Sequence, residues 1–357
     1  MPRASRRVRL RDVAAHAGVS VGSASQAFSR PELVSDEVRK RVLASAEALG
    51  YAGPDPAARR LRLGAAGALG LIFSERLRYQ FTDPASPVFL AGLAEGMEGS
   101  GLGLLLVPDS RFRDATASAV QEAAVDGFVI YSAVRNDPRV DAALGRHLPV
   151  VTVDQPRDLP TPFVGIDDRA AAHRAASYLR ELGHTRVGVL SFVTALDAEG
   201  KLGLFLSTER LVGYREGLAE AWDEDLVRPC RPNAPEPARR GALELLQADP
   251  PPTAILAMSD VFARGALQAA AELRVAVPAA LSIVGFDDSP AATLGTPALT
   301  TVAQPHAEKG RVAAEWLVDA IESGQPIPDD RRLILPTELV VRDSTAPPKA
   351  RSTTVPA

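Results

Sequence analysis

Hydrophobic positions near the start of the chain recur with the spacing of a helix. One set falls at positions i, i+3, i+4 and i+7 and consists of Leu10, Val13, Ala14 and Ala17. This spacing predicts a short amphipathic helix, because it places all four side chains on one face. Gly18 follows directly and is suited to end the helix, since glycine adopts left-handed backbone angles without a steric penalty.

Two further helices are predicted within the first fifty residues. Ser20 is a favourable N-cap for a helix that runs to about Phe28, and Ser35 is one for a helix that Gly50 closes. Three short helices with a glycine turn between the first two are typical of a helix-turn-helix, whose second helix enters the major groove of DNA. A small helical bundle that binds another protein is the alternative. In the DNA-binding interpretation, the contacts come from Val21, Gly22, Ser23, Ser25 and Gln26.

A short segment rich in proline and arginine follows at residues 54–65. Asp55 can cap a helix there and Gly64 ends it after one or two turns, which is too short to be stable alone in water. In one interpretation, Arg59 contacts phosphates and Leu61 wedges into the minor groove. In the other, Leu61 packs on the next domain.

After Gly64 the chain alternates between short apolar runs and helical patterns. The predicted strands are 68–73, 102–107, 127–131, 149–153, 186–191, 253–257 and 281–286. The predicted helices are 87–100, 114–124, 137–146, 168–182, 208–222, 236–248 and 260–272. Such alternation predicts an α/β fold with parallel sheets that helices cover on both faces. The pattern restarts near residue 168, so we expect two lobes with a ligand cleft at the carboxyl ends of the strands.

Composition and charge add a division between the two ends of the chain. The 357 residues are 46% hydrophobic, enough for more than one domain, and no apolar run is long enough to span a membrane. The single cysteine, Cys230, excludes an internal disulfide and favours a reducing cytoplasm. Residues 1–64 carry twelve basic and six acidic side chains, whereas the remainder carries 28 and 38. A basic head on an acidic body favours binding of a polyanion by the head, although a solvated basic tail is the alternative.

Four segments, in order along the chain, resemble one known family. They read DVAAHAGVSV at 12–21, VSDEVRKRVL at 34–43, EALGY at 47–51 and ARRL at 58–61. They are similar to motifs of the lac repressor (LacI/GalR) family of bacterial transcription regulators, and the resemblance continues to about Asp343. It implies an N-terminal helix-turn-helix DNA-binding domain and a two-lobed periplasmic-binding-protein-like effector domain with parallel sheets. It also implies a homodimer and a hinge helix whose leucine, here Leu61, inserts into the operator.

The resemblance further implies where the domains begin and end. The helix-turn-helix domain covers 1–53, the hinge 54–65 and the two-lobed domain 66–343. Lobe 1 takes about 66–165 and 304–332, and lobe 2 takes about 166–303 and 333–343. Residues 344–357 are expected to form a disordered tail, whose lack of leucine heptads argues against a tetramer through a C-terminal coiled coil.

Candidate ligand contacts lie at predicted strand ends and helix starts. Asp154 and Asp287 each follow an apolar run, where a carboxylate can bind vicinal hydroxyl groups. By resemblance, Arg210 reaches the effector, Phe89 offers an aromatic face, and Ser259 stands where most relatives carry asparagine. From the residues alone, each could instead be a helix cap, a surface ion pair or a core side chain.

Two departures from the family pattern concern recognition. Gln26 replaces the arginine that is usual in the recognition helix, which favours contact with adenine over guanine. Ser259 lacks the amide of asparagine, so sugar specificity is not carried over directly. The segment 193–206 is longer and more apolar than the corresponding loop, and its role stays open.

We therefore expect a sequence-specific transcriptional repressor whose operator affinity is controlled by a small polar ligand. The expected partners are a double-stranded DNA operator, a carbohydrate effector and a second copy of the chain, in the cytoplasm at the nucleoid. No cofactor or metal is expected, because the five histidines lack metal-ligand spacing and neither a phosphate-binding loop nor a nucleophile elbow occurs. The alternatives are a nucleoside-responsive or activating regulator, a sugar-binding protein without a DNA role, and an enzyme that uses the cleft.

Overall fold

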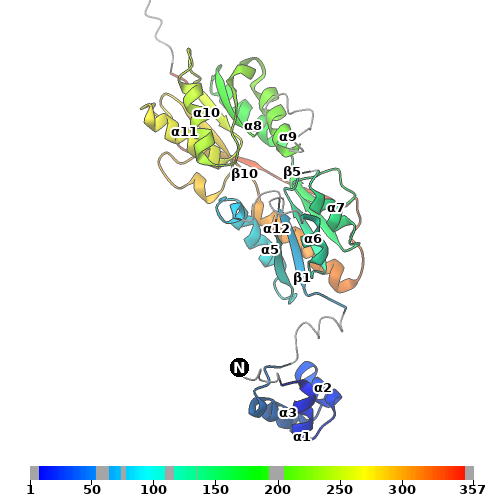
Figure 1. Ribbon diagram of the computed structural model, residues 1–357. Helices are drawn as coiled ribbons and strands as arrows, with labels where there is room; N and C mark the ends of the chain where they lie inside the picture. Colours follow the sequence, from blue (N-terminus) through cyan, green and yellow to red (C-terminus); the bar gives the residue numbers. More distant parts are fainter. Residues whose placement is uncertain are drawn as a thin grey trace, which may run out of the picture. The chain divides into compact units, whose positions relative to one another are not determined.

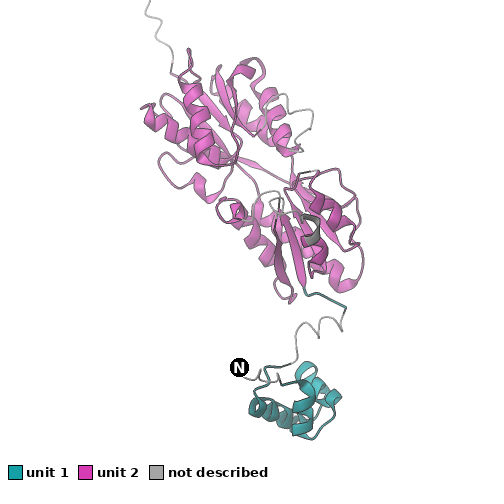
Figure 2. Ribbon diagram, viewed as in Figure 1, with its two compact units in different colours: residues 1–67 teal, residues 68–357 magenta. Residues whose placement is uncertain are grey.

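The computed structural model describes residues 8–53, 64–73, 78–108, 116–134, 136–192 and 205–349. The chain divides into two compact units, Met1–Gly67 and Ala68–Ala357 (Figure 2), and each is described by itself. Arg59 and Leu61, for which DNA contacts are expected, lie outside the described residues, as does most of the segment 193–206.

The described part of unit 1 consists of helical elements. They are α1 (Leu10–Ala17), α2 (Val21–Ser29), the 3-10 turn η1 (Pro31–Leu33) and α3 (Asp36–Leu49). Gly18 and Gly50 end α1 and α3 with φ angles of 64° and 65°, the left-handed conformation that favours glycine. The hydroxyl of Ser20 accepts a hydrogen bond of 3.0 Å from the backbone N–H of Ser23 and so caps α2. The predicted helix-turn-helix is confirmed.

Small apolar side chains form the core of unit 1. The buried residues are Val13, Ala14, Ala17, Ala24, Ala27, Val42 and Ala46. At the border of this core the rings of Phe28 and Tyr51 meet edge to face, with their centroids 5.8 Å apart. Because α2 buries Ala24 and Ala27 against its neighbours, the opposite face of this helix is left to solvent.

The described residues of unit 2 form two six-stranded sheets (Figure 1). The first has the order β11-β5-β4-β3-β1-β2 and consists of β1 (Ala68–Phe73), β2 (Gly103–Val107), β3 (Gly127–Tyr131), β4 (Val150–Val153), β5 (Phe163–Ile166) and β11 (Arg332–Leu335). The second has the order β12-β10-β9-β8-β6-β7 and consists of β6 (Val187–Ser191), β7 (Val227–Pro229), β8 (Ala254–Ala257), β9 (Ser282–Asp287), β10 (Thr300–Ala303) and β12 (Glu338–Val340). Only the pairing of β10 with β12 is antiparallel among these strands. The expectation of two lobes with parallel sheets is confirmed, and the lobes are called lobe 1 and lobe 2 in that order.

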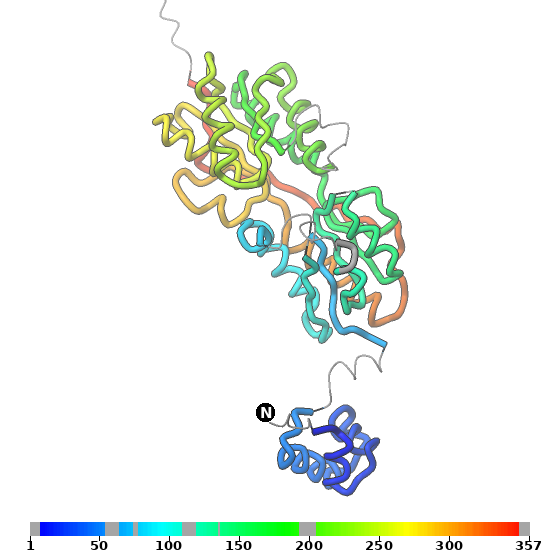
Figure 3. Tube along the Cα trace, viewed as in Figure 1, coloured from blue at the N-terminus to red at the C-terminus, as the bar shows by residue number. Residues whose placement is uncertain are grey.

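Helices cover both sheets, as the chain trace in Figure 3 also shows. Lobe 1 has η2 (Tyr79–Phe81), α5 (Ser86–Gly96), α6 (Thr116–Glu122), α7 (Pro138–Leu144) and α12 (His306–Ser323). Lobe 2 has α8 (Asp168–Glu181), α9 (Phe205–Leu218), η4 (Ala219–Ala221), η5 (Glu224–Leu226), α10 (Pro235–Leu246), α11 (Asp260–Glu272) and η6 (Pro290–Ala292). In β3 of lobe 1, Val129 and Tyr131 join one apolar core and Phe128 and Ile130 another. Alternate residues of one strand therefore fill cores on opposite faces of the sheet.

Close packing of α12 on α5 fixes the start of α12 against lobe 1. A side chain at Gly92 would collide with the backbone carbonyl of Ala307, and one at Gly310 with that of Phe89. Glycine is therefore required at both positions for the two helices to approach. This contact positions His306, the first residue of α12, and Lys309, one turn later.

The chain passes between the lobes three times. The first passage follows β5 and the second follows β10. The third lies between β11 and β12, at residues 336–337. The expected crossing near Leu333 is therefore wrong, because residues 332–335 still pair with β5 in lobe 1.

The expectation of a disordered tail from residue 344 is also wrong for its first residues. Ser344 is fully buried, and its hydroxyl accepts a hydrogen bond of 2.8 Å from the backbone N–H of Thr300. Its backbone carbonyl accepts one of 2.8 Å from the N–H of Ile283. The carbonyl of Ala346 accepts a further bond of 2.9 Å from the hydroxyl of Ser282. Residues 344–346 therefore belong to the fold of lobe 2.

Candidate functional site

The solvent-facing side of α2 carries the residues that were predicted to contact DNA. Val21 is 50% exposed, and Gly22 and Gln26 are exposed as well. Ser23 and Ser25 are half-buried on the same helix. Gln26 can present its carboxamide to a partner, and a carboxamide matches the donor and acceptor pair on the major-groove edge of adenine.

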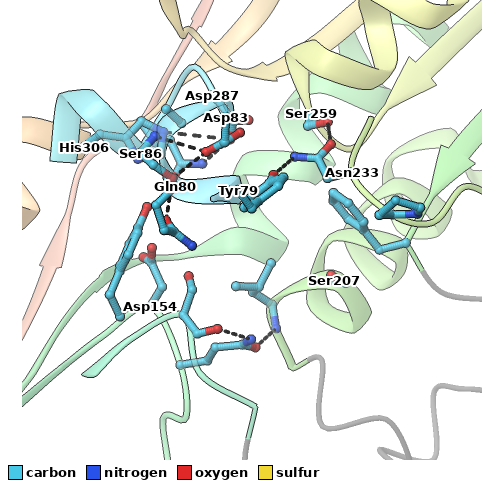
Figure 4. A pocket seen from close by; sticks show the side chains of 18 of the residues that line it. Tyr79, Gln80, Asp83, Ser86, Asp154, Ser207, Asn233, Ser259, Asp287 and His306 are labelled. Atoms are coloured by element: carbon cyan, nitrogen blue, oxygen red, sulfur yellow. Dashed lines mark hydrogen bonds and ion pairs between the residues drawn. The ribbon is translucent and has the colours of Figure 1, made fainter. Parts of the chain in front are cut away.

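A polar pocket lies between the two lobes of unit 2 (Figure 4). Its lining includes Tyr79, Gln80, Asp83, Ser86, Tyr131, Asp154, Gln155, Phe192, Arg210, Asn233, Ser259, Asp287, Gln304 and His306. Four of the five residues proposed as ligand contacts are among them, namely Asp154, Arg210, Ser259 and Asp287. These four come from both lobes, and the two carboxylates stand at the ends of β4 and β9, where the cleft was expected.

Strained backbone angles mark the same strand ends. Ser132, Asp154 and Asp287 have φ angles of 51°, 65° and 118°, which residues with a Cβ seldom adopt. All three line the pocket, directly after or at the end of β3, β4 and β9. Such conformations cost about 1–3 kcal/mol each and cluster at functional sites, because the surrounding structure holds the side chains in place.

Arg210 of α9 is the central cation of the lobe 2 wall. Its Nε donates a hydrogen bond of 2.9 Å to the carboxylate of Asp168, and a terminal nitrogen donates one of 2.8 Å to the carbonyl of Met258. The same terminal nitrogen lies 3.9 Å from the carboxylate of Asp287. The guanidinium also stacks on Phe286, with its central carbon 3.7 Å from the ring centroid. These contacts fix the plane of the guanidinium beside the pocket.

Burial dominates the protonation of the carboxylates around Arg210. It raises the pKa of Asp287 well above the ordinary value, while Arg210 opposes the rise and Asp260 adds to it. Burial likewise raises the pKa of Asp168, again against the effect of Arg210. Desolvation therefore disfavours the charged form of both carboxyl groups, and a ligand hydroxyl that donates to Asp287 would oppose this effect.

Lys309 of α12 is a second buried cation, on the side of lobe 1. Its ammonium donates hydrogen bonds of 2.6 Å both to the carboxylate of Asp154 and to the side-chain oxygen of Gln304. The amide nitrogen of Gln304 then donates a bond of 2.6 Å to Asp287. This chain of contacts connects the end of β4 in lobe 1 with the end of β9 in lobe 2 through the second passage between the lobes.

A direct hydrogen bond also crosses the pocket. The amide nitrogen of Asn233, between β7 and α10 of lobe 2, donates a bond of 2.5 Å to the hydroxyl of Tyr79 in η2 of lobe 1 (Figure 4). The amide oxygen of Asn233 accepts a bond of 2.8 Å from the hydroxyl of Ser259. Asn233 thus places an amide beside Ser259, the position at which the family resemblance leads us to expect an asparagine.

Comparison with known proteins decides the family. Residues 9–53 match the family described as bacterial regulatory proteins, lacI family, and residues 176–345 match the periplasmic binding protein-like domain. HTH-type transcriptional regulator Rv3575c of Mycobacterium tuberculosis is 40% identical to the chain, over 97% of this chain and 99% of the relative. The chain belongs to the lacI family. It is a DNA-binding transcription regulator with an effector-binding domain.

Solved structures of lacI-family regulators agree with the fold over nearly the whole chain. A LacI family transcriptional regulator from Corynebacterium glutamicum is 34% identical and has a TM-score of 0.68, with 95% of this chain and 98% of that chain covered. The complex of transcriptional regulator CelR with cellobiose is 28% identical with the same TM-score, and 95% of this chain and 100% of that chain are covered.

Phe89 does not reach the pocket of this lacI-family protein. Its side chain is fully buried and stacks face to face on Tyr131, with the ring centroids 3.8 Å apart. Tyr131 lines the pocket and Phe89 lies behind it. The expectation that Phe89 offers its own aromatic face is therefore replaced by a role in supporting Tyr131, because the stacked ring leaves Phe89 no exposed surface.

Sequence reasoning missed the part of the pocket that η2 and the following turn provide. The hydroxyl oxygen of Ser86 lies 2.8 Å from the side-chain oxygen of Gln80 and 2.7 Å from the carboxylate of Asp83, and its one hydrogen bonds within this pair of acceptors and holds the turn together. Burial raises the pKa of Asp83, while its bonds with Ser86 oppose the rise. The only local signal was the polar run before Pro87, which periodicity does not distinguish from an ordinary loop.

Among the described residues, no histidine, cysteine, aspartate and glutamate side chains gather in a group of three or more that could hold a metal ion. No helix in the described ranges has the length and apolar character required to cross a membrane.

Proposed function

We propose that this lacI-family regulator is a repressor that binds operator DNA as a homodimer and releases it when an uncharged sugar occupies the pocket. One observation carries the proposal: a single chain combines an exposed recognition helix with a polar pocket whose carboxylates and arginine stand at strand ends of two lobes. We place its action in the cytoplasm, at the nucleoid, because that is where operator DNA is found. Catalysis forms no part of the proposal.

The recognition helix would read each half-site through small and uncharged side chains. Val21 can contact a thymine methyl group, and Gln26 can bind adenine through two hydrogen bonds. Helix-turn-helix proteins read half-sites about one turn of DNA apart as dimers, which supports a second copy of the chain. Since Arg59 and Leu61 belong to the motif that resembles the family's hinge helix, we assign phosphate contact and minor-groove insertion to them.

Pairing of the charges around the pocket favours an uncharged ligand. Arg210 is already bonded to Asp168 and Lys309 to Asp154. Carboxylates such as Asp83 and Asp287 accept hydroxyl donors, and the ring of Tyr131 can support an apolar sugar face. The cellobiose bound by the relative CelR is a ligand of this kind, and it is the probe we choose.

Release would follow from a shift between two arrangements of the lobes. A ligand that binds both walls stabilises the closed arrangement, by as much as its affinity differs between closed and open forms. Closure changes the relative position of the elements that each lobe presents to the partner copy and to the hinge. If the ligand is a co-repressor, the same closure of the lobes would raise the affinity for operator DNA instead of lowering it.

The test begins with operator fragments that the full-length protein selects from a random DNA pool. We expect Gln26→Ala to weaken binding of the selected fragments about tenfold or more, as the loss of a bidentate base contact of about 1–3 kcal/mol predicts. Addition of cellobiose should release the wild-type protein. Arg210→Lys should bind the operator and fail to respond, since lysine retains a cation beside Asp168 and loses the planar contacts of the guanidinium.

The outcomes separate the alternatives. Tighter retardation in the presence of sugar would identify a co-repressor mechanism, and release by nucleosides alone would favour a nucleoside-responsive regulator. Turnover of the added sugar would revive an enzymatic role. If no fragment is enriched, the DNA-reading role of α2 is wrong.

A further inference from the structure

His306, the first residue of α12, is a buried polar side chain that faces the pocket without an internal partner. It is 6% exposed and belongs to the lining (Figure 4). Neither of its ring nitrogens has a hydrogen-bond partner among the described residues. Buried imidazoles are normally bonded, because an unpaired donor or acceptor loses its hydration without compensation.

A second buried histidine in the same unit shows how the fold satisfies such a ring. His184 is 1% exposed, and its Nδ1 lies 2.8 Å from the hydroxyl of Thr253. Its Nε2 lies 3.1 Å from the hydroxyl of Ser282 and 3.0 Å from the carbonyl of Ala346. His184 therefore has a structural role, and His306 lacks the contacts that would give it one.

Three charged groups face His306, and they determine what it can bind. The carboxylate of Asp287 in lobe 2 lies 3.9 Å from its Nε2, too far for a direct hydrogen bond. Lys309 on α12 and Arg210 on α9 both disfavour a positive imidazole, and together with burial they hold the pKa of His306 well below its ordinary value. The ring is thus neutral, with one N–H donor and one acceptor nitrogen.

We propose that His306 and Asp287 together bind one hydroxyl group of the effector, which donates to the carboxylate and accepts from the imidazole N–H. Two hydrogen bonds of about 2.8 Å to one hydroxyl oxygen are compatible with the 3.9 Å that separates the two groups. A phosphate or carboxylate does not suit the pair, because the neutral ring offers an anion no compensating positive charge. This inference rests on the proposed function, since it names a specificity-determining contact of the same pocket.

The first test does not depend on the identity of the effector. In the full-length protein without ligand, His306→Phe and His306→Leu remove two unpaired nitrogens and should raise the unfolding temperature of unit 2 by about 2–6 °C. The matched variants His184→Phe and His184→Leu remove bonded nitrogens and should lower it. Differential scanning calorimetry measures all four. If both His306 variants unfold at or below the wild-type temperature, His306 is structural and the proposal is overturned.

The second test measures ligand chemistry with cellobiose and its matched anion, cellobiose phosphorylated at the non-reducing end. By isothermal titration calorimetry, wild type should bind cellobiose and reject the phosphate ester, and His306→Phe should weaken cellobiose binding about tenfold to a hundredfold. Unchanged affinity in His306→Phe, or preference for the anion, would overturn the hydroxyl contact. If wild type binds neither probe, the sugar named under the proposed function is wrong, and the unfolding temperatures still decide the role of His306.

Discussion

Lobe 1 and lobe 2 share a strand order, yet they build their walls of the pocket from different kinds of structure. In both sheets the first strand lies between the second and third, and the last strand along the chain, β11 or β12, lies at an edge. Lobe 2 supplies Arg210 from α9, Ser259 from the N-cap of α11 and Asp287 from the end of β9. Much of the wall of lobe 1 comes instead from η2 and the turn that follows it. A repeated scaffold therefore provides the cleft, and the connections between its elements provide the chemistry.

The two walls also differ in how they hold charge. The cation of lobe 2, Arg210, stands among Asp168 and Asp287 and stacks on an aromatic ring. The cation of lobe 1, Lys309, has Asp154 as its one carboxylate partner among the ion pairs of the described residues. Four experiments test this difference, and they are ordered by the size of the effect that we expect.

The largest effect is expected for Arg210→Met in the full-length protein. This change leaves two buried carboxylates without a cation and should lower the free energy of unfolding of unit 2 by about 3–5 kcal/mol. Denaturant titration measures it. Arg215→Met on the same helix is the control, since its ion pair with Glu224 is 66% exposed on the arginine side and should contribute less than about 1 kcal/mol. Equal losses in both variants would contradict the importance of the lobe 2 network.

Lys309→Met should destabilise the protein less, by about 3 kcal/mol, because one carboxylate rather than two loses its cation. The double variant Lys309→Met/Asp154→Asn should recover part of this loss, since the remaining amide carries no uncompensated charge. The same denaturant titration gives the coupling between the two positions. A double variant as unstable as the sum of the single ones would show that the pair is not coupled.

The acidic groups of lobe 2 should also make stability depend on pH. Burial raises the pKa of Asp260 to about 6, against the hydrogen bonds that it accepts from Thr301 and Ser289. Between about pH 4 and pH 6 the folded protein therefore keeps a proton that the unfolded chain has released, so the free energy of unfolding falls as the pH rises through this window. A shift of this size corresponds to about 2–3 kcal/mol.

Asp260→Asn tests this sign, because an amide cannot titrate. Thermal unfolding across pH 4–7 should show a flatter profile for Asp260→Asn than for wild type. Asp225→Asn, an exposed carboxylate of the same lobe, should leave the profile unchanged. A wild-type profile that rises between pH 4 and pH 6 with the same slope in Asp260→Asn would contradict the prediction.

The smallest effect is expected for the hydrogen bond that joins the two walls. Tyr79→Phe and Asn233→Ala each remove the bond between the lobes, which should contribute about 1 kcal/mol to the stability of the closed arrangement. In a double-mutant cycle Tyr79→Phe should have little further effect on unfolding in Asn233→Ala, which has already lost this bond together with the one from Ser259. Losses that simply add would mean that the two side chains act independently and that the walls are joined elsewhere.

The sequence predicts regular elements and their ends better than it predicts the turns between them. Asp154 and Asp287 were predicted to lie in the cleft because apolar runs place them at strand ends, and both line the pocket. Tyr79 and Asn233 lie in short connections without hydrophobic periodicity, so no local sequence pattern predicts that their side chains meet in the pocket. The burial of Lys309 could not be predicted either, because a lysine in an amphipathic helix normally marks the side that faces solvent.

The edge strands show a second limit. Strands β11 and β12 are three or four residues long and half exposed, so their patterns resemble those of loops. Their membership in different sheets places the third passage at residues 336–337, a few residues later than expected. Ser344 was assigned to a tail because the family resemblance ends at about Asp343, although its polar groups complete the pairing of Ile283 and Thr300.

The interleaved course of the chain has a consequence for its synthesis. Lobe 1 needs α12 and β11, which come after nearly all of lobe 2, and lobe 2 in turn needs β12 and residues 344–346. A ribosome must therefore finish almost the whole polypeptide before either lobe can close its core. Until then the unfinished α/β segments of both lobes expose apolar surface. The helix-turn-helix is synthesised first and its contacts join residues close in sequence, so it can fold before either lobe is complete.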